Sequence, residues 1–119
     1  MIVSQIDALL IGGPKAFRAD GTKSAMARDP FDRPVMLRKL GFEGDQVADP
    51  TVHGGSDRAV HFYPAEHYPR WIAHFATQDM THPLLEKAGA FGENISASGL
   101  TEDKVRIGDR FRIGKALVE

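Results

Sequence analysis

The residue types best suited to chemistry occur together in residues 53–58, which read His-Gly-Gly-Ser-Asp-Arg. Gly54 and Gly55 lack Cβ atoms, so the backbone there can turn sharply and approach a bound group closely. Arg58 presents a fixed fork of donors that fits a phosphate or a carboxylate, and His53 can change its charge near neutral pH. These properties together predict a loop that cradles an anionic ligand.

A simpler interpretation of the same segment is a surface turn in which Arg58 pairs with Asp57 or with another acid. Taken alone, the segment favours this simpler interpretation. Three further short motifs stand in order around it: Gly-Phe-Glu-Gly-Asp at 41–45, Phe-Gly-Glu-Asn-Ile at 91–95 and Val-Arg-Ile-Gly-Asp at 105–109. Each motif is weak by itself, whereas the ordered set favours a ligand-binding loop.

The ordered set resembles the MOSC domain, the C-terminal domain of molybdenum cofactor sulfurases, and within it the bacterial YiiM-like branch. The resemblance runs from about Ile2 to Val118, which is almost the whole chain. It implies that the chain binds molybdenum cofactor, a pterin with a terminal phosphate. His53, Gly54, Gly55, Asp57 and Arg58 would then line the cofactor pocket.

The resemblance also places Glu93 and Asn94 at the pocket, where they would close it. An amide offers donors and an acceptor, which suits the edge of a pterin, but Asn94 is also a residue that tolerates an awkward turn. The two interpretations are about even from the residues alone, and the resemblance favours the site. Asp45 either closes its own tight turn or organises the neighbouring loop by bonding backbone N–H groups near His53.

Relatives of this kind reduce N-hydroxylated compounds to amines, so the resemblance implies an N-hydroxylated small molecule as substrate. It also implies a flavodoxin- or ferredoxin-like electron donor. The rival function is a non-catalytic module that binds the cofactor or carries sulfur for it. A third class is a small β-barrel that binds another anion or a protein partner.

The sequence departs from the family pattern in its thiol content, because it contains no cysteine. In YiiM-like proteins, the strand corresponding to residues 116–119 leads into a Pro-Arg-x-Pro-Cys segment whose cysteine is the expected molybdenum ligand. We therefore expect one MOSC-like domain over residues 1–119 that is incomplete at its C-terminus, a fragment rather than a natural short relative. We expect no metal ligand within the chain and no reductase activity from the chain alone.

The composition is that of an ordinary water-soluble domain: 119 residues, 42% hydrophobic and 26% charged. The formal net charge is −1, so no global field attracts nucleic acid or an anionic membrane surface. The N-terminus has no basic leader, and no apolar run approaches the ~20 residues of a membrane span. We expect a cytoplasmic protein with neither nucleic acid nor a membrane as partner.

The pattern of short apolar runs predicts a mostly β fold of the α+β type. Together with the resemblance, it indicates a barrel-like or half-closed sheet, a MOSC-like β-barrel with one main helix. The expected strands and loops, in chain order, are a strand over 2–11, a loop and short strand over 17–28 stopped by Asp29 and Pro30, a strand over 35–40 closed by Gly41, a long loop over 43–57, a strand over 59–63, a helical turn over 84–87 and a loop entering a strand over 91–97.

The main helix is expected to begin at Pro64, a good first helical residue, or nearer to Pro69, which weakens the first turn. Tyr68, Trp71, Ile72 and Phe75 then fall at helical spacing on one face. We interpret this aromatic stripe as core packing rather than as a cofactor site.

The last 15 residues predict a β-hairpin. Apolar and basic residues alternate over 105–113, Gly108 and Asp109 provide a bend, and Gly114-Lys115 fits a two-residue turn with glycine first. The returning strand begins at Ala116 and is still apolar where the sequence ends. An apolar strand edge is a template for pairing, so we expect self-association through this C-terminal strand edge.

Overall fold

The structure is a computed structural model that describes residues 4–12, 15–16, 23–24, 27–46 and 54–119. Its strands are β1 (Ile6–Ile11), β2 (Lys15–Ala16), β3 (Lys23–Ser24), β4 (Asp29–Pro30), β5 (Leu37–Arg38), β6 (Gly41–Phe42), β7 (Phe62–Pro64), β8 (Ile95–Ala97), β9 (Phe111–Ile113) and β10 (Ala116–Val118). Its helices are the α-helix α1 (His67–Ala76) and two 3-10 helices, η1 (Ser56–Arg58) and η2 (Pro83–Glu86). The described part of the chain is therefore mostly β with one α-helix, as predicted.

The central sheet has the strand order β4-β1-β8-β7. β1 pairs antiparallel with both β4 and β8, and its register with β8 shifts between Ile6 and Ala8. β7 and β8 run parallel, so the chain between them must cross over, and this crossover contains α1. The other described strands form separate two-stranded ladders: β9 with β10, β2 with β3, and β5 with β6.

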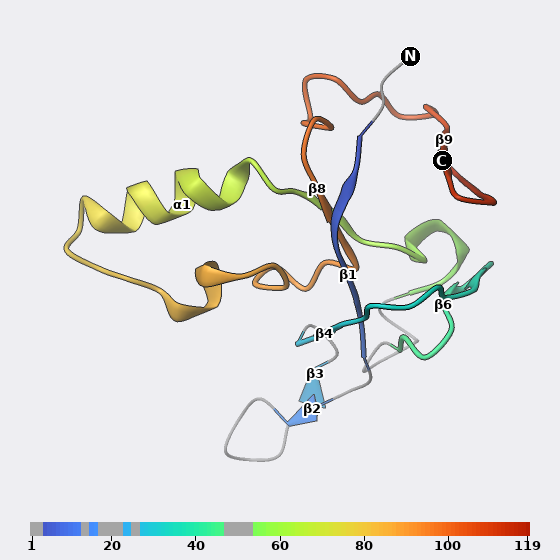
Figure 1. The fold of residues 1–119 in the computed structure, drawn as a ribbon, viewed down its shortest axis with the longest axis horizontal. Coiled ribbons are helices and arrows are strands. Elements are labelled where there is room, and N and C mark those ends of the chain that lie inside the picture. Colours follow the sequence, from blue (N-terminus) through green and yellow to red (C-terminus); the bar gives the residue numbers. More distant parts are fainter. Residues whose placement is uncertain (1–3, 13–14, 17–22, 25–26, 47–53) are drawn as a thin grey trace.

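The crossover projects from the sheet as a helical arm. In Figure 1, α1 leads away from the sheet and the following segment, which includes η2, returns beneath it. The β5–β6 and β9–β10 ladders lie on the other side of the sheet (Figure 1). Within the described residues the sheet is open, with β4 and β7 at its edges, so the barrel closure expected from the sequence is not seen.

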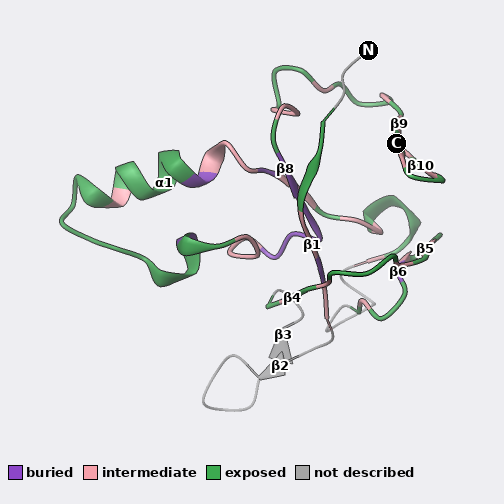
Figure 2. Ribbon diagram, in the orientation of Figure 1, coloured by how far each residue is buried: buried purple, intermediate pink, exposed green. Residues whose placement is uncertain are grey.

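The core is small and centres on β1 and β8. Figure 2 shows the buried residues along these two strands and at the start of α1. Leu10, Ile95 and Ala97 are at most 2% exposed. Glu93, Asn94 and Ser96 are buried as deeply as these apolar residues. Because buried polar groups must be hydrogen-bonded, the segment entering β8 combines core and polar network.

Two strand predictions in the first half of the chain are wrong. Asp29 and Pro30 do not stop a strand; they form β4, which pairs with the end of β1. The strand expected over 35–40 is limited to β5, because the chain reverses at 39–40 and pairs with β6. Gly41 therefore begins the returning strand, with φ at +134° and no space for a Cβ beside the Ala59 carbonyl.

The main helix is present, but its predicted packing is only partly right. Pro64 ends β7 and is not the first helical residue. Pro69 lies in the first turn of α1, where a missing N–H is tolerated because the first four N–H groups of a helix have no partner within it. Tyr68 is buried, whereas Trp71 is 39% and Ile72 50% exposed. The spacing thus predicts which residues share a face, but the arm leaves most of that face in solvent.

The C-terminal hairpin is confirmed. β9 and β10 pair in the register Ala116 with Ile113, and Gly114 has φ +58° in the turn between them. The alternation over 105–109 is not a strand. Asp109 closes a turn there by accepting a hydrogen bond from the Arg106 N–H through Oδ2, at 2.9 Å, and Ile107 is fully exposed.

The remaining element predictions hold with shifted bounds. The first strand is β1, the 91–97 segment is a loop that enters β8, and the helical turn is η2. The strand expected over 59–63 begins only at Phe62, because η1 occupies the residues just before it. Residues 17–22, 25–26 and 47–53, within the expected 17–28 segment and the long loop, lie outside the described residues.

No helix in the described ranges has the length and hydropathy needed to cross a lipid bilayer.

Candidate functional site

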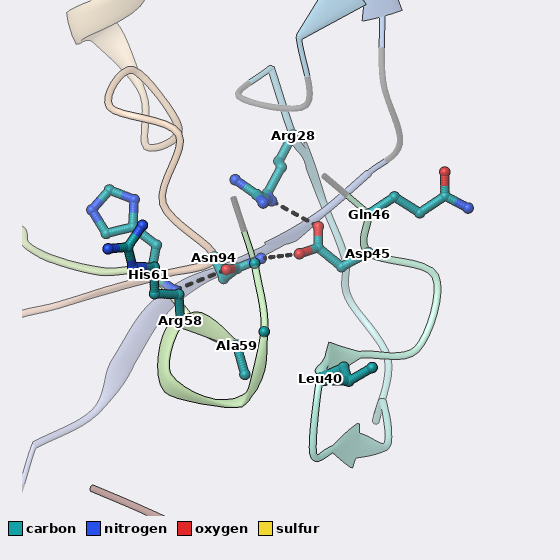
Figure 3. Close-up of a pocket in the computed structure, with 10 residues that line it drawn as sticks. Arg28, Leu40, Asp45, Gln46, Arg58, Ala59, His61 and Asn94 are labelled. Atoms are coloured by element: carbon teal, nitrogen blue, oxygen red, sulfur yellow. Dashed lines mark hydrogen bonds and ion pairs between the residues drawn. The ribbon is translucent and has the colours of Figure 1, made fainter. Parts of the chain in front are cut away.

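A cleft of about 530 Å³ opens beside the start of β8 (Figure 3). Its walls come from separate stretches of the chain that the sheet brings together. The lining residues are Arg28, Leu40, Asp45, Gln46, Gly54, Gly55, Arg58, Ala59, His61 and Asn94. The cleft thus joins the 41–45, 53–58 and 91–95 motifs around one space.

Asp45 is the hub of the cleft wall. Its Oδ1 accepts hydrogen bonds from Arg28 Nε at 2.7 Å and from the Gly12 N–H at 3.1 Å, and its Oδ2 accepts one from Asn94 Nδ2 at 2.9 Å. The side chains of Asp45 and Arg28 are only 7% and 10% exposed. Both carboxylate oxygens are therefore occupied, and the Asp45 charge is balanced by the Arg28 guanidinium rather than facing the cleft unpaired.

Asn94 links this hub to β1 and to the segment before β7. Its Nδ2 also donates to the Leu10 carbonyl at 3.1 Å, and its Oδ1 accepts the His61 N–H at 2.9 Å. Its backbone bonds the same two residues: the Leu10 N–H donates to the Asn94 carbonyl, and the Asn94 N–H donates to the His61 carbonyl. Both amide donors are thus committed inside the protein, which makes Asn94 a structural part of the wall.

Arg58 is a charged residue of the cleft lining that has no ion-pair partner among the described residues. Gly55 precedes η1 with φ +89° and ψ 172°, and its carbonyl accepts the Arg58 N–H at 3.1 Å. Within the described part of the chain, the Arg58 guanidinium makes no ion pair, either with Asp57 or with another carboxylate. A Cβ placed on Gly55 would meet no atom within 4 Å, so the backbone there faces open space beside the Arg58 side chain.

His61 adds a second group that can carry positive charge. It lines the cleft three residues after Arg58, and Figure 3 shows the two side chains on the same side of the labelled Asn94. The backbone of His61 is fixed by Asn94 through the hydrogen bonds given above. The charges of the paired Arg28 and Asp45 cancel, so the guanidinium of Arg58 makes this side of the cleft positive.

Glu93 lies elsewhere, in the core. Its side chain is fully buried, Tyr68 donates its hydroxyl hydrogen to Oε2, and the Phe91 N–H donates to Oε1 at 3.1 Å. The Tyr68 oxygen accepts the Gly89 and Ala90 N–H groups at 3.0 and 3.1 Å. Burial, and then the hydrogen bond to Glu93, raise the pKa of Tyr68, so this hydroxyl keeps its hydrogen.

The structure therefore separates the residues that the sequence grouped. Gly54, Gly55, Arg58 and Asn94 line the cleft, whereas Asp57 and Glu93 do not. His53 lies outside the described residues. Asp45 does organise a loop, but through Gly12, Arg28 and Asn94; whether it also bonds groups near His53 lies outside the described residues.

Sequence reasoning missed the apolar lining residues Leu40 and Ala59 and the polar lining residues Arg28, Gln46 and His61. No local motif marks Arg28, because its partners Asp45 and Gly92 are distant in sequence. His61 could have been found from its place just after the 53–58 motif and before a strand. Among the described residues, no group of three or more His, Cys, Asp or Glu side chains could hold a metal ion.

Comparison with known proteins shows which family the chain resembles. The family model of the MOSC domain matches residues 49–119. Protein YiiM of Escherichia coli is 48% identical over 100 residues, which are 84% of this chain and 43% of that protein. The uncharacterized protein YflK of Bacillus subtilis is 43% identical over 114 residues, 94% of this chain and 48% of YflK. A protein named reductase from Gibberella moniliformis is 37% identical over 91 residues, 76% of this chain and 15% of that protein.

Solved structures show the same arrangement. The crystal structure of YiiM from Escherichia coli matches with a TM-score of 0.64 and 35% identity, over 98% of this chain and 44% of that chain. YiiM from Geobacillus stearothermophilus matches with a TM-score of 0.66 and 31% identity, over 97% and 48%. This chain spans less than half the length of these relatives. The chain belongs to the MOSC domain family.

Proposed function

We propose that this chain is the molybdenum cofactor-binding part of a YiiM-like protein that reduces N-hydroxylated small molecules to amines. The observation that carries the proposal is the cleft lined by Gly54, Gly55 and Arg58, where Gly55 faces open space and Arg58 has no ion-pair partner among the described residues. The match to YiiM and the sequence likeness to a reductase support it.

The residues present fit one end of the cofactor. The Arg58 guanidinium and the turn at Gly54 and Gly55, where a phosphate could approach the backbone, suit the phosphate of the cofactor. These residues include no thiolate, the molybdenum ligand that the resemblance implies, because the sequence contains no cysteine. When bound, the cofactor would supply the electrons for N–O cleavage; the residues of this chain would hold its phosphate and orient it.

A second candidate function is a non-catalytic cofactor-binding or sulfur-carrying module. The described cleft is compatible with this candidate as well, because Arg58 and the two glycines would hold an anion whether or not the whole protein acts on a substrate. If the protein is the reductase, a flavodoxin- or ferredoxin-like protein would serve as its electron donor.

The proposal predicts that Arg58 dominates anion affinity. Arg58→Ala should weaken binding of inorganic pyrophosphate to the chain about tenfold or more, because a charge-assisted hydrogen bond is worth about 1.5–3 kcal/mol. The affinity of Arg58→Lys should fall between those of the wild type and Arg58→Ala, because a point charge replaces a bidentate fork. Isothermal titration calorimetry measures the affinity.

The control for this experiment is Arg112→Ala, which removes an exposed guanidinium from β9, outside the cleft lining. Unchanged pyrophosphate affinity in both Arg58 variants would overturn the proposal. An equal loss in Arg112→Ala would show that the anion binds by general charge alone.

We also propose that the chain self-associates through the edge of β10. In the described residues β10 pairs only with β9, Leu117 is 61% exposed, and a two-stranded hairpin alone is marginally stable. The accessible surface is 8941 Å², against about 6,400 Å² for a compact monomer of this mass. Sedimentation velocity should show a molar mass that rises with concentration.

Leu117→Lys should reduce this association, because a charge at a strand edge opposes pairing. Met36→Lys, which places a lysine at another half-exposed apolar position, serves as the control and should leave it unchanged. A concentration-independent monomer with a sharp melt would contradict the expectation.

A further inference from the structure

We infer that Glu93 is a positioning residue that acts through Tyr68 to set the wall of the cleft, and that it does not touch the bound anion. This inference deepens the proposed function and rests on it for its ligand. Glu93 is fully buried and absent from the cleft lining, while its neighbour Asn94 lines the cleft. Both Glu93 oxygens already accept hydrogen bonds from inside the protein.

The first step of the argument is the tie between α1 and the loop before β8. Tyr68, in the first turn of α1, donates to Glu93 and accepts from the Gly89 and Ala90 N–H groups. One phenol oxygen thus joins the two ends of this loop. Gly89 packs so closely against Leu10 that an added Cβ would lie 3.0 Å from its Cδ2 atom, so the loop has little freedom to move.

The second step is the route from this loop to the cleft. Gly92 lies between Glu93 and Phe91, whose N–H donates to the Glu93 carboxylate. Its carbonyl accepts a hydrogen bond from Arg28 Nη1. Arg28 is therefore fixed at two points, by Gly92 and by Asp45. A shift of residues 91–93 would move one of the two acceptors that hold this guanidinium.

The third step is the consequence for Asn94 and His61. Asn94 follows Glu93 directly, and its Oδ1 accepts the His61 N–H. If the 91–93 backbone moved, this hydrogen bond would lengthen and His61 would lose its fixed place beside the cleft. The carboxylate of Glu93 therefore acts on the anion site through the backbone on either side of it.

The experiment is a double-mutant cycle with Glu93→Gln, Tyr68→Phe and the double variant, using inorganic pyrophosphate as the probe. Each single variant should weaken binding by about threefold to tenfold. The double variant should bind pyrophosphate about as well as the single variant with the lower affinity, because the two side chains act as one unit. If Glu93 touched the anion directly, Glu93→Gln would remove a repelling charge and strengthen binding, Tyr68→Phe would leave binding unchanged, and the inference would be overturned. Glu86→Gln, an exposed change on η2, is the matched control.

Amide hydrogen exchange supplies a readout that does not need a ligand. Both single variants should accelerate exchange at the His61 N–H, which reports on the cleft wall, and leave exchange in the β9–β10 hairpin unchanged. Unchanged His61 exchange would overturn the positioning role. Absence of pyrophosphate binding in the wild-type chain would overturn the proposed function instead, while the exchange data would still decide the role of Glu93.

If Glu93→Gln does not fold, Tyr68→Phe carries the test alone. This variant keeps the ring and removes one oxygen, so the Gly89 and Ala90 N–H groups lose their acceptor. Weaker pyrophosphate binding together with faster His61 exchange would support the inference. Pyrophosphate affinity and His61 exchange equal to those of the wild type would contradict the inference.

Discussion

Asp45→Ala is expected to lower the free energy of unfolding by about 3–5 kcal/mol, the cost of breaking a buried ion pair by removing one partner. The change leaves the Arg28 guanidinium, 10% exposed, without a counter-charge. It also removes the acceptor used by the Gly12 N–H and by Asn94 Nδ2. A loss of this size is a large share of the 5–15 kcal/mol that typically stabilises a domain.

Urea unfolding followed by Trp71 fluorescence measures this loss, because Trp71 is the single tryptophan of the chain. Asp32→Ala is the matched control: Asp32 also pairs with an arginine, Arg33, but at 3.6 Å and with its side chain 96% exposed. Exposed pairs contribute roughly 0–1 kcal/mol, so this control should unfold close to the wild type. Equal midpoints for Asp45→Ala and Asp32→Ala would show that Asp45 is not the hub of the wall.

Asn94→Ala is expected to cost about 3 kcal/mol or more and to abolish anion binding in the cleft. The change leaves the Leu10 carbonyl, the Asp45 Oδ2 atom and the His61 N–H without their side-chain partner. Each buried group left unsatisfied costs about 1–3 kcal/mol. Binding fails as well, because the side-chain link from Asp45 through Asn94 to the His61 N–H is lost and only the backbone hydrogen bonds of residue 94 remain.

Unfolding in urea and calorimetric titration with pyrophosphate measure the two effects on the same sample. Gln78→Ala, which removes an exposed amide just after α1, should change neither. A folded Asn94→Ala variant that binds pyrophosphate as well as the wild type would show that Asn94 does not hold the wall together.

The elements predicted well from the sequence are those fixed by neighbouring residues. Gly114 and Lys115 determine the C-terminal hairpin by turn chemistry alone, and η2 and the entry into β8 follow from short apolar runs between breakers. The face of α1 was predicted correctly as a face and wrongly as core at Trp71 and Ile72. Helical spacing shows which side chains lie together, but only the tertiary arrangement shows whether anything covers them.

The lining residues that could be predicted from the sequence lie mainly within one short segment, residues 54–58. Gly54, Gly55 and Arg58 line the cleft because one turn places them side by side. The ion pair of Arg28 with Asp45 joins segments that approach only when the sheet forms. No rule of sequence spacing relates residues so far apart, so the ion pair that supports the cleft wall could not be derived before the fold was known.

The pairing of β1 with β8 also determines when the cleft can form during synthesis. Ile6 lies opposite Ala97, and closing so long a loop slows folding because its entropy is lost before the contacts are gained. A growing chain holds β1 and β4 early, but it lacks Asn94 until most of the domain has left the ribosome. The anion site is thus completed late, and until then no ligand bound in the cleft can stabilise the nascent domain.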